Sequence, residues 1–255
     1  MKKYLTQNMQ SGNFNYTNKI EEELFMKRTK IYNLIILDKS GSMFDIRQAA
    51  INGFNETLGS IQAAQKKYLE RQEHYVTFVT FCGCGIQKVY DNVPVEKTHM
   101  ITSEQYEPCC STPLYDAIGF TLSKMKKIIK DDEDSTAIVT IITDGEENSS
   151  EEYELPQVQA LIHSLKEEGW TFAYMGTCHD VKSVTTSLSI TNVITFERSE
   201  KNTAEVFKQD REARERFYCK VNDLRAAEPL EMPSCDRKAR YKKIQDEYFD
   251  NDENK

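Results

Sequence analysis

Short runs of apolar, β-branched and aromatic residues recur along the chain and alternate with amphipathic segments. Runs of this length and composition are typical of buried strands. They lie at residues 31–37, 75–82, 137–143, 171–176 and 192–196. Between most of them, apolar residues at three- and four-residue spacing predict helices, over 43–68, 114–129, 155–165 and 180–188. This alternation predicts an α/β fold, a doubly wound and mostly parallel sheet with helices on both faces.

A sixth strand is expected at one edge of this sheet. The segment "GIQKVYDNV", residues 85–93, lies close behind the second apolar run and is predicted to turn back as an antiparallel edge strand. We therefore expect six strands in the order 3-2-1-4-5-6, in which the strands at 31–37 and 137–143 are neighbours.

The length of 255 residues suits one sizeable α/β domain with extensions. We divide the chain into a charged N-terminal arm at 1–30, the α/β domain at 31–197 and a charged, partly helical C-terminal extension at 198–255. The last ten residues, "DEYFDNDENK", are expected to fray. Apolar residues at helical spacing predict that the extension packs back on the domain: Phe207, Phe217, Val221 and Leu224.

Composition narrows the possible partners and compartments. A formal net charge of -8 argues against a nucleic-acid backbone as the main partner. No apolar stretch follows the N-terminal lysines as a leader would require, and no segment has the length of a membrane span. We therefore expect a cytoplasmic protein that contacts neither nucleic acid nor a membrane.

The seven cysteines show no CxxC pair and no regular spacing, which favours reduced thiols over a disulfide framework. Cys82 and Cys84 flank one glycine and are candidates for a soft-metal site. Without a second pair of thiols in the pattern, two strand-end thiols are the favoured interpretation.

Oxygen-bearing side chains follow two of the predicted strands. In "LDKSGSM", residues 37–43, Asp38, Ser40 and Ser42 occupy alternate positions and can point to the same side. Asp144 comes directly after the strand at 137–143, and Thr112 precedes a proline suited to the first turn of a helix. Because ligands of open α/β sheets bind beyond the carboxyl ends of the strands, these three segments predict a site for a hard cation.

Together these five residues resemble the metal-ion-dependent adhesion site (MIDAS) of the von Willebrand factor A (vWA) domain. That motif is Asp-x-Ser-x-Ser after the first strand, a later Thr, and an Asp after the fourth strand, and the resemblance covers roughly residues 30–197. It implies a Rossmann-like fold. One local difference is that Cys109, Cys110 and Ser111 precede the threonine, where small glycines are frequent in related domains.

The resemblance also implies a function. Mg²⁺ or Mn²⁺ would be held by the hydroxyls of Ser40, Ser42 and Thr112, while Asp38 and Asp144 hold coordinated waters. A cation that keeps part of its charge attracts a carboxylate from a partner protein. The resemblance therefore implies a non-enzymatic, metal-dependent protein-binding module, and intracellular members of the family commonly act in larger assemblies.

Other interpretations of the same residues remain open. The first is a scaffold without functional metal. In it, Asp38 would accept hydrogen bonds from loop amides, the two serines would cap the next helix, and Asp144 would open an Asx-turn with Gly145. A Mg²⁺-dependent, phosphatase-like hydrolase is the enzymatic alternative, although Ser40 stands where haloacid-dehalogenase-like phosphatases have a second acid.

Two further titratable residues near the expected site have ordinary interpretations. For Asp116 we favour a first-turn helix acid over a metal ligand. For His179 we favour a solvated loop residue, with Asp180 as the cap of the next helix.

Overall fold

The computed structural model describes residues 28–130, 132, 134–177, 186–227, 234–245 and 248–249. Most of the predicted N-terminal arm, the first part of the predicted helix at 180–188 and all but two of the last ten residues lie outside this range.

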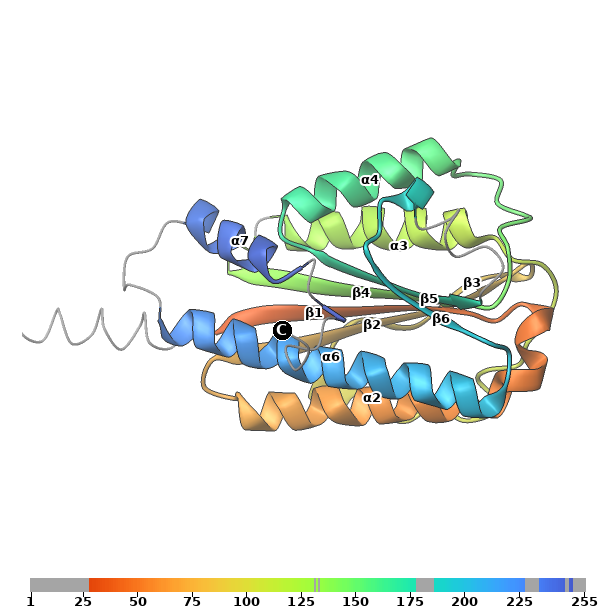
Figure 1. Cartoon of the computed structure of the whole chain (residues 1–255), viewed down its shortest axis with the longest axis horizontal. Helices are drawn as coiled ribbons and strands as arrows, with labels where there is room; N and C mark the ends of the chain where they lie inside the picture. The colour runs from red at the N-terminus through yellow and green to blue at the C-terminus, as the bar shows by residue number, and fades with distance from the viewer. Residues whose placement is uncertain are drawn as a thin grey trace, which may run out of the picture.

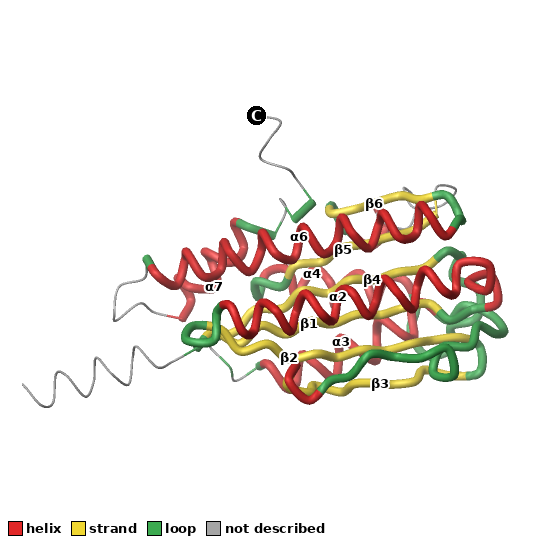
Figure 2. Tube along the Cα trace, turned by 90° about the horizontal axis from the view of Figure 1, so that it is seen from below, coloured by secondary structure: helices red, strands yellow, loops and turns green. Residues whose placement is uncertain are grey.

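The sheet has six strands, and Figure 2 shows their order, β3-β2-β1-β4-β5-β6. Neighbouring strands are parallel except for the β2–β3 pair, which is antiparallel. The strands are β1 (Thr29–Asp38), β2 (Gln72–Cys82), β3 (Gly85–Pro94), β4 (Ser135–Thr143), β5 (Thr171–Thr177) and β6 (Asn192–Phe196). The predicted fold class, strand order and antiparallel edge are thereby confirmed. β1 and β4 are buried almost throughout, as expected for strands covered on both faces, whereas the edge strand β3 is largely accessible.

Helices cover both faces of the sheet (Figure 1). One face carries α3 (Leu114–Ile129) and α4 (Leu155–Glu167), and the other carries α2 (Arg47–Lys67) and α6 (Glu200–Ala226). Shorter elements are the 3-10 helices η1 (Gly41–Ile46) and η2 (Val95–Lys97) and the helix α7 (Ser234–Lys243). None of the described helices has both the length and the apolar character needed to cross a bilayer.

Helix α6 is part of the core. Phe207, Phe217 and Val221 are buried and Leu224 packs against the same apolar cluster, so the apolar stripe predicted for the extension is confirmed. Gly53 on α2 permits the close approach of the two helices, because a Cβ atom there would overlap the Phe207 ring.

A buried polar network fixes α6 to the sheet. The guanidinium of Arg214 has no solvent exposure and donates to Asp210 (2.8 Å), Asn33 (3.2 Å) and Thr140 (2.5 Å). His74 on β2 lies edge-on to Tyr218, and burial together with the charge of Arg214 lowers the pKa of His74 to about 3. Because each buried charge needs a partner, this network defines the position of α6 against β1 and β4.

Candidate metal-binding site

The predicted site residues lie where β1 and β4 end. These strands are parallel neighbours, with Leu37 opposite Ile142, so their carboxyl ends meet at one edge of the sheet. Asp38 is the last residue of β1, and Asp144 follows the last residue of β4. The register of the sheet therefore brings the two carboxylates to the same edge, beside η1.

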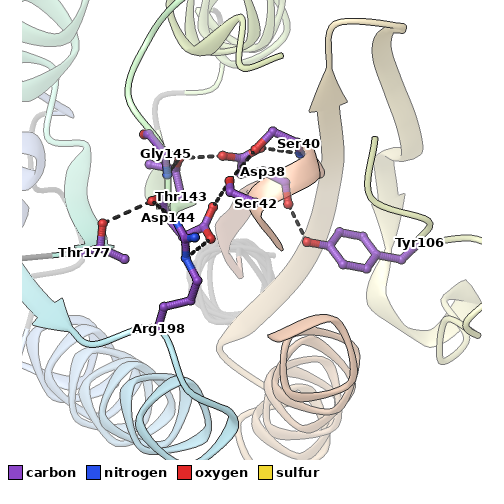
Figure 3. Close-up of polar contacts among 9 residues, drawn as sticks. All are labelled: Asp38, Ser40, Ser42, Tyr106, Thr143, Asp144, Gly145, Thr177 and Arg198. Atoms are coloured by element: carbon purple, nitrogen blue, oxygen red, sulfur yellow. Dashed lines mark hydrogen bonds and ion pairs between the residues drawn. The ribbon is translucent and has the colours of Figure 1, made fainter. Parts of the chain in front are cut away.

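Asp38 organises the loop that follows β1. Its side chain is fully buried, with Oδ1 accepting from the Ser40 amide (2.6 Å) and Oδ2 from the Thr143 hydroxyl (2.6 Å). Burial raises the pKa of the Asp38 carboxyl to about 6, although the hydrogen bonds from Thr143 and Ser40 act in the opposite direction. The main-chain oxygen of Asp38 accepts a hydrogen bond from the Tyr106 hydroxyl (Figure 3).

Ser40, Ser42 and Asp144 form a chain of polar contacts (Figure 3). The Ser40 and Ser42 hydroxyl oxygens are 3.1 Å apart, and Ser42 Oγ donates to Asp144 Oδ1 at 2.5 Å. The other oxygen of Asp144 lies 2.8 Å from Nε of Arg198. Burial raises the pKa of Asp144, and the hydrogen bond from Ser42 and the charge of Arg198 oppose that rise.

Thr112 reaches the same place from the loop before α3. Its amide donates to Asn148 Oδ1 (2.8 Å), and its carbonyl accepts from the Asn148 amide (3.2 Å). A Cβ atom added to Gly145 would lie 3.2 Å from Thr112 Oγ1, 3.4 Å from Ser42 Oγ and 3.8 Å from Asp38 Oδ2. The three side chains therefore face one small space beside Gly145.

All five predicted residues thus come together, as three hydroxyls and two carboxylates. Such an all-oxygen donor set suits a hard cation of the Mg²⁺ or Mn²⁺ class and offers no soft ligand. The alternative local uses are realised only in part. Asp38 does accept a loop amide, but Ser40 makes no capping bond at η1, and the turn at Gly145 is closed by Thr143, whose hydroxyl accepts from the Gly145 amide (3.2 Å).

Comparison with known proteins was informative only at the level of structure. No protein-family model matches the chain, and the search of curated proteins found no match. Proximal thread matrix protein 1 from the mussel byssus is similar with a TM-score of 0.51 and 16% identity over 71% of this chain and 47% of that one. A structure of the same mussel protein with a zinc-occupied MIDAS motif has a TM-score of 0.50, with the same identity and coverage.

The chain has a vWA-type fold. The pilus adhesin SpaC from Lactobacillus rhamnosus GG is also similar, with a TM-score of 0.50 and 14% identity over 73% of this chain and 30% of that one. The chain therefore spans about half the length of the mussel protein and less of the adhesin. At these identities the likeness extends to the fold alone, so the function of the site has to be argued from its chemistry.

Arg198 is a residue of the site that the sequence analysis missed. It follows β6, two residues after Phe196, and besides its ion pair it donates to the Asp144 carbonyl (3.3 Å). Thr177 at the end of β5 donates to the same carbonyl (3.1 Å). The available signal was a basic residue just after a strand that ends at the site edge. In a fold of this type, that edge collects residues from several strands.

The loop after β4 is held by two acids of unforeseen function. Asp116 lies in the first turn of α3, as expected, but its carboxylate accepts hydrogen bonds from three amides of this loop. The donors are Glu151 (2.9 Å), Glu152 (3.0 Å) and Tyr153 (2.7 Å). Glu147 caps α3 by accepting from the Tyr115 amide (2.9 Å). These contacts fix Asp144 and Thr112 relative to each other.

Four cysteines meet at this edge of the sheet. Cys82 and Cys84 do lie at the end of β2 and in the turn after it, but the sequence pattern did not predict that Cys109 and Cys110, in the loop before Thr112, lie against them. His179 and Asp180 lie outside the described residues.

Proposed function

We propose that this chain is a metal-dependent protein-binding module. In this proposal Ser40, Ser42 and Thr112 hold Mg²⁺ or Mn²⁺ directly, and Asp38 and Asp144 hold its coordinated waters. The convergence of the five side chains beside Gly145, from three separate segments, is the observation that supports it most strongly. The metal supplies a coordination position for a carboxylate of the partner.

The electrostatics of the site favour attraction of an anionic ligand. Neutral hydroxyls do not reduce the charge of a bound cation. Asp38 already shares its charge with two hydrogen-bond donors, and Asp144 with the Arg198 guanidinium. A cation held in this way keeps much of its positive charge, and an acidic side chain of another protein can complete its coordination.

A protein is a more suitable partner than a small anion because of the surface beside the site. Phe44 lies in η1, two residues after Ser42, and is 62% exposed. An exposed aromatic side chain in the segment that carries a polar site is typical of binding surfaces, where the ring supplies buried apolar area around a specific polar contact. We therefore propose that a partner carboxylate binds the metal while apolar groups around it cover Phe44.

A hydrolase is less well supported. A general base has to be within reach of the water that it activates and has to be available for the proton. Asp116, the acid of α3 closest in sequence to Thr112, is hydrogen-bonded to three amides and holds a loop. We accordingly propose a non-enzymatic module that acts in the cytoplasm as part of a larger assembly.

The proposal is tested by using the full chain as bait in lysate, in Mg²⁺ and in EDTA, with Ser42→Ala as the variant and Ser60→Ala on α2 as the matched control. We expect the same proteins to be retained by the unmodified chain and by Ser60→Ala in Mg²⁺, and to be lost in EDTA and with Ser42→Ala. Partners retained equally under all conditions would contradict the metal-dependent module and support a scaffold. Metal-dependent turnover in a parallel phosphatase and esterase screen, abolished by Ser42→Ala, would instead support a hydrolase.

A further inference from the structure

Four thiols gather next to the oxygen site. Cys82 ends β2 and Cys84 lies in the turn between β2 and β3, whereas Cys109 and Cys110 come from the loop before α3. The Sγ atoms of Cys82 and Cys109 are 3.0 Å apart, as are those of Cys84 and Cys110. A third contact of 3.6 Å joins Cys109 to Cys84. The four sulfurs are therefore linked in one continuous cluster. In the sequence, 24 residues lie between Cys84 and Cys109.

The backbone conformation of both loops allows the four sulfurs to come close. Gly83, between the first two cysteines, donates its amide to the Ser111 carbonyl (2.8 Å), and a Cβ atom at Gly83 would overlap Ser111. Only glycine allows the two loops to approach so closely. Cys110 has a φ of 56°, a left-handed conformation that is unfavourable for a residue with a side chain. Two loops thus adopt unusual geometry at the point where the sulfurs meet.

We propose that Cys82, Cys84, Cys109 and Cys110 form a tetrahedral thiolate site for a zinc-class cation, separate from the oxygen site. Four thiols would release four protons and bind Zn²⁺ as thiolates, because the thiolate is the ligand form. Zn–S bonds of about 2.3 Å place sulfurs about 3.8 Å apart, so the two closest pairs would separate by less than about 1 Å. Cys84 and Cys110 are exposed, which gives the cation a path from solvent.

Two disulfides are the other product that these thiols can form. The connections would be Cys82 to Cys109 and Cys84 to Cys110. The cluster favours metal because Cys109 contacts both Cys82 and Cys84, so its sulfur is shared and not committed to one pair. The Sγ atoms of Cys82, Cys84 and Cys109 all lie within 4.8 Å of one another, so they can share one cation. Cys110 contacts Cys84 and would close on that cation as the fourth ligand.

The thiol cluster is linked directly to the loops of the oxygen site. The Cys109 amide donates to the Lys39 carbonyl (2.9 Å), and the Cys110 carbonyl accepts from the Gly41 amide (3.0 Å). Lys39 and Gly41 flank Ser40, and Thr112 lies two residues after Cys110. A metal on the four sulfurs would therefore hold together the loops that carry Ser40 and Thr112.

Metal content and cobalt spectroscopy test the proposal on the full chain, without reference to any binding partner. The protein is purified without chelator for zinc analysis, then stripped and reconstituted with Co²⁺. We expect about one zinc per chain and the sulfur-to-cobalt charge-transfer absorption of a tetrahedral thiolate centre. Cys84→Ser and Cys109→Ser should lose at least 90% of both signals, whereas Cys219→Ser, a control on the exposed part of α6, should keep them.

The Ser42→Ala variant separates the two sites, because it disturbs the oxygen site and should leave the thiolate absorption unchanged. Alkylation of the unmutated chain provides a second test, which does not depend on whether a cysteine variant folds. Zinc should protect four thiols from alkylation until a strong chelator is added. Absence of zinc together with absence of the charge-transfer absorption would overturn the proposal. So would a mass four hydrogens lower than that of the reduced chain, which would show two disulfides.

Discussion

Gly145→Ala places a methyl group in the space that Thr112, Ser42 and Asp38 face, without changing any of the five site residues. The new carbon would lie 3.2 Å from Thr112 Oγ1, 3.4 Å from Ser42 Oγ and 3.8 Å from Asp38 Oδ2. A cation bound to these hydroxyls at about 2.1 Å, with its waters, needs the same space. We therefore expect this substitution to impair metal binding while all five side chains remain present.

The size of the effect follows from these distances. Displacing coordinated water or shifting one hydroxyl should weaken binding at least about tenfold, which corresponds to about 1.4 kcal/mol. The backbone should tolerate alanine, because Gly145 does not have a positive φ. Alanine gains roughly 0.4–1 kcal/mol by restricting the unfolded chain, and the tight contact with Thr112 opposes that gain. The free energy of unfolding should therefore change by less than about 1 kcal/mol.

Mn²⁺ titration followed by electron paramagnetic resonance, together with urea unfolding, provides the assay. Gly59→Ala on α2 is the matched control, because a Cβ atom there meets nothing within 4 Å. The control should keep its Mn²⁺ affinity and gain roughly 0.5–1 kcal/mol of stability. A folded Gly145→Ala variant with unchanged affinity would refute the view that Thr112, Ser42 and Asp38 surround one cation.

Three further outcomes follow from the contacts around the site and the core. Arg198→Gln removes the positive charge paired with Asp144 and should raise Mn²⁺ affinity roughly two- to fivefold. The effect is small because the arginine side chain is 42% exposed and the pair is screened by solvent. An equal or lower affinity in the same titration would contradict this prediction. Asp116→Ala should lower the free energy of unfolding in urea by about 1–3 kcal/mol, because three amides lose their acceptor. The control Asp91→Ala, which removes an exposed ion pair with Lys124, should change it by less than about 1 kcal/mol. The folded-state pKa of His74 is about 3, below the ordinary value of 6.5, so the unfolded chain takes up a proton first and stability falls as pH drops below about 6.5. By pH 5 this loss is about 2 kcal/mol. Urea unfolding at pH 7 and pH 5 measures it, and the difference in free energy of unfolding between the two pH values should shrink by that amount in His74→Phe. An unchanged difference would show that the histidine is not held neutral.

Much of the fold could be predicted because its determinants are local or periodic. The strands β1 and β4 are apolar runs that need burial on both faces, and the amphipathic period of α3 marks the face that packs against them. Four of the site residues could be predicted because they end or follow strands whose carboxyl ends meet at the same sheet edge, and Thr112 because it lies just before the helix α3. Their convergence required no knowledge of side-chain packing.

Contacts between segments distant in sequence could not be predicted in the same way. The pair between Arg198 and Asp144 depends on how the chain leaves β6, and the thiol cluster depends on two loops meeting at Gly83. The burial of Arg214 could not be predicted either, because an arginine in a charged helix is expected to face solvent until its partners on β1 and β4 are known. Such features depend on tertiary register, which residue patterns do not encode.

Anomalous diffraction from a crystal of the chain soaked in Mn²⁺ tests the central claim most directly, since it locates the cation without assuming its ligands. The account predicts a peak within coordination distance of the Ser40 and Ser42 hydroxyls, beside Gly145, and the loss of that peak in Ser42→Ala crystals. A saturating soak that gives Mn²⁺ peaks elsewhere and none at this edge of the sheet would contradict the claim.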